Sequence, residues 1–268
     1  MNFTSEQIER YSRHILLQDV GVEGQEKISN SKVLVIGAGG LGASILFYLA
    51  AAGVGTLGII DGEVVDLSNL QRQIIHFTFD IGKAKVQSAK EKIEQVNPNV
   101  KVITYNEFFN ANNAFDIIKD YDFITDGTDN FSTKFLINDA CVLAGKPFSH
   151  GGVLQFEGQT LTHLPGTVCY RCVFHSPPPS NVVPTCSQAG VLGAVVGMLG
   201  TIQATEVLKF LVNTGELLTN CLLTFNAKSM NFRTIKINEN KECLICGDYP
   251  IITELVETEQ VVCELKKG

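Results

Sequence analysis

The sequence predicts an α/β fold with a mostly parallel sheet, an antiparallel extension in its C-terminal part and a structural zinc site. Three observations support this prediction. A short apolar run at 33–36 leads into a glycine-rich turn, an alanine-rich segment and a second apolar run at 56–60. From residue 151 the pattern changes to the alternation that is typical of antiparallel strands. Two CxxC pairs, far apart in the chain, supply four cysteines.

The segment 32–61 is organised as a nucleotide-binding βαβ unit. The β-branched run at 33–36 is typical of a strand that is buried on both faces. The turn that follows is rich in glycine, which lets the backbone approach a phosphate at the start of a helix. Asp61 ends the second strand, where a carboxylate can accept hydrogen bonds from ribose hydroxyls. The segment therefore predicts a Rossmann-like site that includes Gly37, Gly39, Gly40, Gly42 and Asp61.

Further elements alternate along the chain. Helices are expected from Thr4 to Leu16, where Thr4 and Gln7 match a capping box, and at 41–52, 83–96, 112–120 and 131–144. Strands are expected at 100–105, 121–125 and from 147, followed by a hairpin at 153–163 that turns around Glu157-Gly158. A long apolar helix spans 189–213, and two last strands lie at 222–225 and 232–237. The four glycines of the long helix imply that another backbone packs closely against it.

The length and composition fit one large α/β domain. The chain has 268 residues, of which 45% are hydrophobic and 18% charged, so a substantial core is available. We expect a single unit over 1–268. It would hold a nucleotide-binding half at 1–150, a half at 151–250 with the antiparallel strands, a crossover loop and the zinc ligands, and a tail at 251–268.

Charge and hydropathy restrict the surroundings and partners of the protein. The formal net charge of −7 argues against a general nucleic-acid binder. The polar N-terminus has no apolar leader, and the longest apolar run, near 191–202, is shorter than the ~20 residues that a membrane span needs. We therefore expect a cytoplasmic protein with neither nucleic acid nor a membrane as a partner. In that compartment, cysteines indicate metal ligation or reactivity rather than disulfides.

The CxxC pairs, Cys169 with Cys172 and Cys243 with Cys246, are the strongest isolated motif. Each pair can hold one zinc ion from a tight turn, and two pairs complete a tetrahedron without an open position. This predicts a structural zinc site that the fold must assemble. The alternative is two unrelated pairs of reduced cysteines.

Other residues indicate chemistry on a phosphate. Asp129 follows the strand at 121–125, at the edge of the sheet where magnesium or a ribose binds in open α/β folds. Lys85 lies in the first turn of a helix, where the dipole disfavours a cation unless an anion lies in front of it. Together with Arg72, these residues favour attack at the α-phosphate, and no P-loop motif is present. For Lys85, simple surface exposure is the alternative.

Cys186 is a candidate nucleophile. It lies just before the long apolar helix, and the start of a helix lowers the pKa of a thiol. Covalent capture of an activated acyl group is one interpretation, and a packed or merely exposed cysteine is the other.

Four motifs in one order resemble the ThiF/MoeB/HesA family, the bacterial relatives of ubiquitin-activating enzymes. They are Gly37-Ala38-Gly39-Gly40-Leu41-Gly42, Ser68-Asn69-Leu70-Gln71-Arg72-Gln73, Thr128-Asp129-Asn130 and the two CxxC pairs. The resemblance extends from Arg10-Tyr11-Ser12-Arg13 to Cys246-Gly247.

The resemblance implies adenylation. The C-terminal glycine carboxylate of a small ubiquitin-like sulfur carrier, ending in Gly-Gly, would attack the α-phosphate of ATP and become an acyl-adenylate ready for sulfur. It also implies a homodimer and a sulfur donor such as a cysteine desulfurase. The pathway, thiamine thiazole or molybdopterin biosynthesis among others, stays open.

The resemblance also implies residue roles. Arg13 would reach the ATP phosphates from the other subunit, Cys186 would bond the activated carrier, and Cys169, Cys172, Cys243 and Cys246 would hold Zn²⁺. The residues implied to bind ATP and Mg²⁺ are Gly40, Asp61, Ser68, Asn69, Leu70, Gln71, Arg72, Lys85, Asp129 and Asn130.

Two other functions compete with adenylation. A NAD- or FAD-dependent oxidoreductase would explain the glycine turn but leaves Arg72, Lys85 and the cysteine pairs without a role. A non-catalytic scaffold that binds a ubiquitin-like protein predicts the loss of the ATP-binding cations, which are present here.

Overall fold

A single eight-stranded sheet forms the centre of the computed structural model, which describes residues 3–178 and 189–256. The strand order is β3-β2-β1-β4-β5-β6-β7-β8. The first five strands are parallel, and β6, β7 and β8 are antiparallel to their neighbours. The predicted parallel sheet with an antiparallel extension is confirmed. The strands are β1 Lys32–Ile36, β2 Thr56–Ile60, β3 Lys101–Tyr105, β4 Phe123–Asp126, β5 Phe148–Leu154, β6 Glu157–His163, β7 Cys221–Asn226 and β8 Asn231–Lys236.

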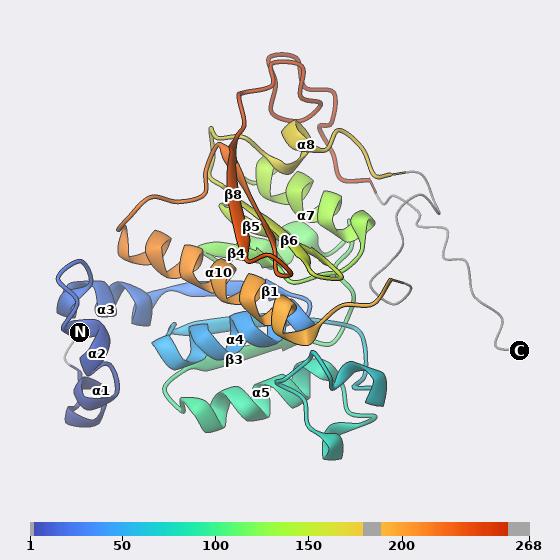
Figure 1. Ribbon diagram of the computed structural model, residues 1–268. Coiled ribbons are helices and arrows are strands. Elements are labelled where there is room, and N and C mark those ends of the chain that lie inside the picture. The colour runs from blue at the N-terminus through green and yellow to red at the C-terminus, as the bar shows by residue number, and fades with distance from the viewer. Residues whose placement is uncertain (1–2, 179–188, 257–268) are drawn as a thin grey trace, which may run out of the picture.

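Helices cover both faces of the sheet (Figure 1). One face packs against α3 (Gly21–Asn30), α4 (Gly40–Ala52), α5 (Lys85–Val96) and α10 (Gly193–Val212). The other face packs against α6 (Ala114–Ile118), α7 (Phe131–Leu143) and α8 (Tyr170–Val173). The alternate residues of β1 enter different cores, Val33 and Val35 on the first face and Leu34 and Ile36 on the second. A strand that packs into an apolar core on each of its two faces needs a continuous apolar run, which explains the sequence of β1.

The glycine turn is held by very close backbone packing. Gly37 has a φ of +93°, which favours glycine, and its carbonyl oxygen occupies the place that a Cβ on Gly42 would need. The same closeness explains the glycines of α10. A Cβ on Gly200 would lie 2.7 Å from the carbonyl oxygen of Leu41 in α4. The expectation that another backbone packs against the long helix is confirmed.

Some boundaries differ from the expected ones. The N-terminal helix begins with the predicted capping box at Thr4 and Gln7 but breaks at Tyr11 into α1 (Ser5–Arg10) and α2 (Ser12–Ile15). Helix α3 was not expected. The hairpin turns at Gln155-Phe156 rather than Glu157-Gly158, because Gln155 takes the left-handed conformation.

Helix α10 is the one described helix that is long and apolar enough to cross a membrane by length and composition. It packs against α4 and β5 in the core of the molecule, as Figure 1 shows. Its place in the core accounts for its apolar composition.

Candidate active site

A crevice of about 950 Å³ opens at the edge of the sheet where the parallel strands end. The turn after β1 and the loop after β4 border it, and these neighbouring strands connect to opposite sides of the sheet. This is the switch point at which open α/β sheets bind ligands. The crevice continues over the antiparallel strands, where Gln159, Asn226 and Arg233 line it. It can therefore hold a ligand that extends well beyond a nucleotide.

Most of the residues expected to bind ATP meet in this crevice. Those that line it are Gly37, Gly39, Gly40, Asp61, Ser68, Asn69, Arg72, Lys85, Asp129 and Asn130. Gly42, Leu70 and Gln71 are not among its lining residues. Gly42 instead packs on the carbonyl group of Gly37, beneath the turn.

Asp61 ties the glycine turn to the end of β2. Its carboxylate oxygens accept hydrogen bonds from the N–H groups of Ala38 and Glu63, both at 2.8 Å. Burial raises the pKa of Asp61, although the nearby charge of Lys85 opposes this. A carboxylate has about four acceptor positions, so lone pairs remain for ribose hydroxyls.

Two cations reach the crevice from the segment after β2 and from α5. The Arg72 guanidinium donates to the carbonyl of Ser68 at 3.0 Å. Lys85 is buried, and its Nζ lies 2.5 Å from the carboxylate of Glu63, which is 59% exposed. An exposed carboxylate is a weak competitor for a buried ammonium, so a phosphate entering the crevice can pair with Lys85. Lys83 instead pairs with Glu91 and Asp80 outside the crevice.

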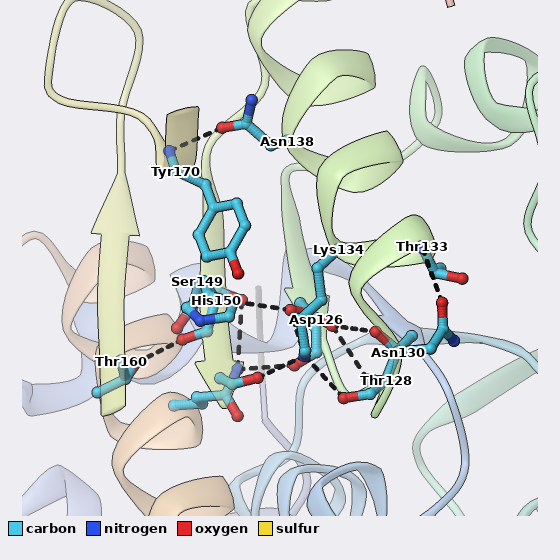
Figure 2. A network of polar contacts seen from close by, with 12 residues as sticks. Asp126, Thr128, Asn130, Thr133, Lys134, Asn138, Ser149, His150, Thr160 and Tyr170 are labelled. Carbon is cyan, nitrogen blue, oxygen red and sulfur yellow. Dashed lines mark hydrogen bonds and ion pairs between the residues drawn. The ribbon is translucent and has the colours of Figure 1, made fainter. Parts of the chain in front are cut away.

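A buried polar network below the crevice joins β4, α7 and β5 (Figure 2). The Lys134 ammonium donates to the Asp126 carboxylate at 3.0 Å and to the carbonyls of Thr128 and Gly151 at 2.7 and 2.6 Å. Burial alone would raise the pKa of Asp126, but the Lys134 charge and the His150 hydrogen bond outweigh burial and hold it below its usual range. Sequence reasoning missed these residues and chose Asp129 and Asn130 at this strand end. Asp129 lines the crevice, whereas Asp126 is buried.

Burial favours the neutral form of His150 in this network. Burial lowers its pKa, and the Asp126 carboxylate only partly compensates. Because a carboxylate accepts, Nδ1–H of His150 is the donor in their 2.9 Å contact. Nε2 therefore carries a lone pair. His150 also lines the crevice.

The four predicted metal ligands come together at the edge of the molecule. Their sulfur atoms all lie within 4.8 Å of one another, and the closer pairs are 3.4–3.8 Å apart. Four sulfurs at about 2.3 Å from one zinc ion would be about 3.8 Å apart. The cluster joins the segment around α8 to the segment 240–247. Four thiolates without an oxygen ligand fit zinc, so the assembly of the site is confirmed and zinc is the metal that it suits.

Arg13 is not among the residues that line this crevice. Arg13 lies on α2 and is exposed. The nearby Tyr11 hydroxyl accepts a hydrogen bond from Asn97, which follows α5, and this contact holds α2 near the end of the sheet where the strands begin. Figure 1 shows α1 and α2 at the far side of the molecule from the glycine turn. Cys186 lies outside the described residues.

Comparisons with known proteins agree with this geometry. The chain is 46% identical over 260 residues to "Probable adenylyltransferase/sulfurtransferase MoeZ" of Mycobacterium tuberculosis, covering 95% of this chain and 65% of that protein. It is 41% identical over 265 residues to "Sulfur carrier protein adenylyltransferase" of Thermus thermophilus, covering 97% of this chain and 98% of that protein. "Adenylyltransferase and sulfurtransferase MOCS3" of Dictyostelium discoideum is 45% identical over 257 residues, which cover 95% of this chain and 60% of that protein. The chain thus spans less than two thirds of the length of MoeZ and MOCS3.

Solved structures share the fold. Escherichia coli MccB superposes with a TM-score of 0.80 at 23% identity, covering 92% of this chain and 75% of that one. PaaA superposes with a TM-score of 0.75 at 25% identity, covering 89% and 76%. The ThiF family model matches residues 11–245, which include the crevice and three of the four cysteines. The chain therefore belongs to the ThiF family.

Proposed function

We propose that the protein is an adenylyltransferase that activates the C-terminal glycine carboxylate of a ubiquitin-like sulfur carrier. One observation carries the proposal. The crevice joins a phosphate-binding glycine turn to Arg72, Lys85 and Asp129, which come from three different segments. The names of the relatives, adenylyltransferases of sulfur carriers among them, support the same activity.

The reaction needs positioning and charge more than covalent chemistry. A carboxylate oxygen of the carrier attacks the α-phosphorus of ATP, the bond to the β-phosphate breaks, and pyrophosphate leaves with its electron pair. Arg72 and Lys85 would stabilise the charge that builds on the phosphate oxygens. Asp129 and Asn130 would hold Mg²⁺, which adds positive charge at the phosphates when bound. Asp61 would orient the ribose.

The cations also favour adenylation over hydride transfer. A nicotinamide or flavin site needs the glycine turn and Asp61, but it has no use for a buried lysine whose ion pair is with an exposed glutamate. A scaffold without activity would not need to keep Arg72 and Lys85 in the crevice.

The proposal includes the remaining parts of the reaction. The cysteine cluster would hold structural Zn²⁺ and keep α8 in place beside the crevice. Thiolates persist in a reducing compartment, which fits the cytoplasm. The acyl-adenylate would receive sulfur from a donor such as a cysteine desulfurase, in thiamine thiazole or molybdopterin biosynthesis. A homodimer would bring Arg13 of one subunit to the crevice of the other.

ATP–pyrophosphate exchange tests the function directly. The purified protein is incubated with ATP, Mg²⁺, labelled pyrophosphate and each of several ubiquitin-like carriers that end in Gly-Gly. We expect exchange with at least one carrier and none with the same carrier lacking its last glycine. Thermal-shift measurements with ATP–Mg²⁺ and with NAD supply the comparison. Stabilisation by NAD alone, with no exchange for any carrier, would refute the proposal.

A further inference from the structure

His150 leaves one buried atom without a partner. Its Nε2 is enclosed and, within the part of the chain that the structure describes, makes no hydrogen bond. The ring cannot turn to find a partner easily. Its Nδ1–H is bonded to Asp126 at 2.9 Å, and the ring packs on Tyr170 with the centroids 4.4 Å apart. Buried polar atoms almost always have a partner, either an ordered water or another group, so this acceptor is available to a donor on a ligand.

The Nε2 atom is directed along β5 toward the crevice. Gly152 lies two residues further on the same face of the strand and lines the crevice, as His150 does. A Cβ built on Gly152 would lie 3.4 Å from Nε2 of His150, 3.3 Å from Cγ of Gln159 and 3.4 Å from the side-chain amide nitrogen of Gln159. Gly152 has no side chain to fill this place, so the long, flexible side chain of Gln159 lies over it and has to move when a ligand reaches Nε2.

The surroundings exclude a cation at this place. The Lys134 ammonium bonds the same oxygen of Asp126 as His150 does. A metal ion on Nε2 would therefore face a fixed positive charge and a carboxylate that is already paired. The site suits a neutral hydrogen-bond donor.

The chemistry of the two substrates limits which group can donate a hydrogen bond to Nε2 of His150. At neutral pH the phosphates of ATP and the attacking carboxylate offer only acceptors. The donor closest to the carboxylate is the peptide N–H of the last carrier residue. His150 lies on the β5 side of the crevice, toward the antiparallel strands and away from Asp61 and the glycine turn. The carrier can occupy that side while the nucleotide occupies the other.

We propose that Nε2 of His150 binds the last peptide N–H of the carrier and thereby positions its carboxylate for attack. The inference rests on the proposed function and adds a residue that selects for a peptide acid. An acid without an N–H next to its carboxyl carbon would leave Nε2 unpaired in the complex and would react more slowly.

A double-mutant cycle between protein and substrate tests the contact. One partner is the wild type or His150→Phe, which keeps an aromatic ring of similar size. The other is a semisynthetic carrier that ends in glycine or in N-methylglycine, which lacks the N–H. We expect each single change to lower kcat/KM of pyrophosphate exchange roughly tenfold, and the double change to lower it no further. Independent, multiplying effects overturn the inference.

Two further variants separate binding from folding. Gly152→Ala replaces no member of the Asp126 network and places a methyl group beside Nε2, so it should reduce the preference for glycine over N-methylglycine. His163→Phe changes a buried histidine of β6 that does not line the crevice, so it should leave this preference unchanged. A preference in Gly152→Ala equal to that of the wild type overturns the inference.

A measurement of ATP binding distinguishes a failure of the inference about His150 from a failure of the proposed function. Stabilisation by ATP–Mg²⁺ in a thermal-shift assay should be the same for the wild type and His150→Phe. Loss of this stabilisation in a folded His150→Phe would place His150 at the nucleotide and overturn the inference alone. If the wild type exchanges pyrophosphate with no carrier, the proposed function fails and this inference fails with it.

Discussion

At the scale of single residues, the crevice works through charges that come from separate loops. Arg72 follows β2 and Asp129 follows β4, and both line the crevice. Asp129 is exposed, and the one hydrogen bond described for the side chain of Arg72 goes to the carbonyl of Ser68. Neither side chain belongs to the core, so replacing either should change activity much more than stability.

We predict that Arg72→Ala or Asp129→Ala nearly abolishes ATP–pyrophosphate exchange. Loss of one charge-stabilising contact typically lowers the rate by about 10²–10³-fold. Exchange assays measure the loss, and urea unfolding should give the midpoint of the wild type. Lys83→Ala is the matched control, because Lys83 lies close to the site but pairs with Glu91 outside the crevice. Near-normal exchange in either crevice variant would contradict the role assigned to that residue.

His76 connects the glycine turn to α5 and makes stability depend on pH. Its Nε2–H donates to the carbonyl of Ala38 and its Nδ1 accepts from the Ser88 hydroxyl, both at 2.9 Å. Burial lowers the pKa of His76 to about 4, against the unfolded value of 6.5. A group with a lowered folded pKa contributes stability above its unfolded pKa, and this contribution is lost as the pH falls through the folded pKa.

We therefore predict that acid weakens the wild type more than a His76→Gln variant. Between pH 6.5 and pH 4, protonation of this one imidazole should remove about 3 kcal/mol of the free energy of unfolding. Urea unfolding across this pH range measures the difference in slope between the two proteins. Equal slopes would show that His76 does not titrate in this way.

At the scale of elements, α10 packs against the first turn of α4 and thereby stabilises the glycine turn that precedes it. Gly200 meets the first turn of α4, where a Cβ would lie 2.7 Å from the carbonyl oxygen of Leu41. Gly197, one turn earlier in α10, has more room, since its Cβ would be 3.6 Å from the Ser44 hydroxyl oxygen. Alanine substitutions at Gly197 and Gly200 should therefore have different effects on the stability of the protein.

Gly200→Ala should destabilise the protein by about 1–3 kcal/mol, because the rigid backbone of α4 cannot move away without disturbing the turn. Gly197→Ala should be neutral or should stabilise by up to about 1 kcal/mol, because alanine favours a helix. Urea unfolding of both variants tests the pair. Similar destabilisation by both substitutions would show that α10 is packed equally tightly at the two positions.

At the scale of the whole molecule, the cysteine cluster fastens the C-terminal part to the segment around α8. Cys169 and Cys243 are 74 residues apart in the chain, and their sulfur atoms are 3.7 Å apart. Closing such a loop is costly in entropy, and metal binding compensates for that cost.

Removal of the metal should therefore lower the melting temperature. We expect about one zinc ion per chain by elemental analysis. A strong chelator, or the Cys246→Ser substitution, should remove the zinc and lower Tm. Cys221→Ser is the control, because this half-buried cysteine of β7 lies outside the cluster. A metal-free protein with an unchanged Tm would count against a structural zinc.

The position of Arg13 makes the proposed dimer testable by complementation. Arg13→Ala and Arg72→Ala should each be inactive as homodimers. A purified heterodimer of the two should regain about half of the wild-type exchange activity, because one crevice then has both arginines. A heterodimer as inactive as its parents would show that Arg13 does not act across the subunits.

The sequence by itself determined the local units of this protein. Its glycine turn, apolar runs and CxxC pairs depend on neighbours within a few residues, and so the βαβ unit, the antiparallel extension and the four ligands could be predicted. The capping box at Thr4 was equally local.

Only the tertiary structure decided which distant residues meet. The break at Tyr11, the presence of α3 and the network of Asp126, Lys134 and His150 depend on contacts between segments far apart in the chain. Lys83 and Lys85 show the same limit, because they are two residues apart in the chain and only Lys85 lines the crevice, whereas Lys83 pairs with Glu91. The physical reason is that burial and charge pairing are set by packing across the sheet, and no local pattern encodes that packing.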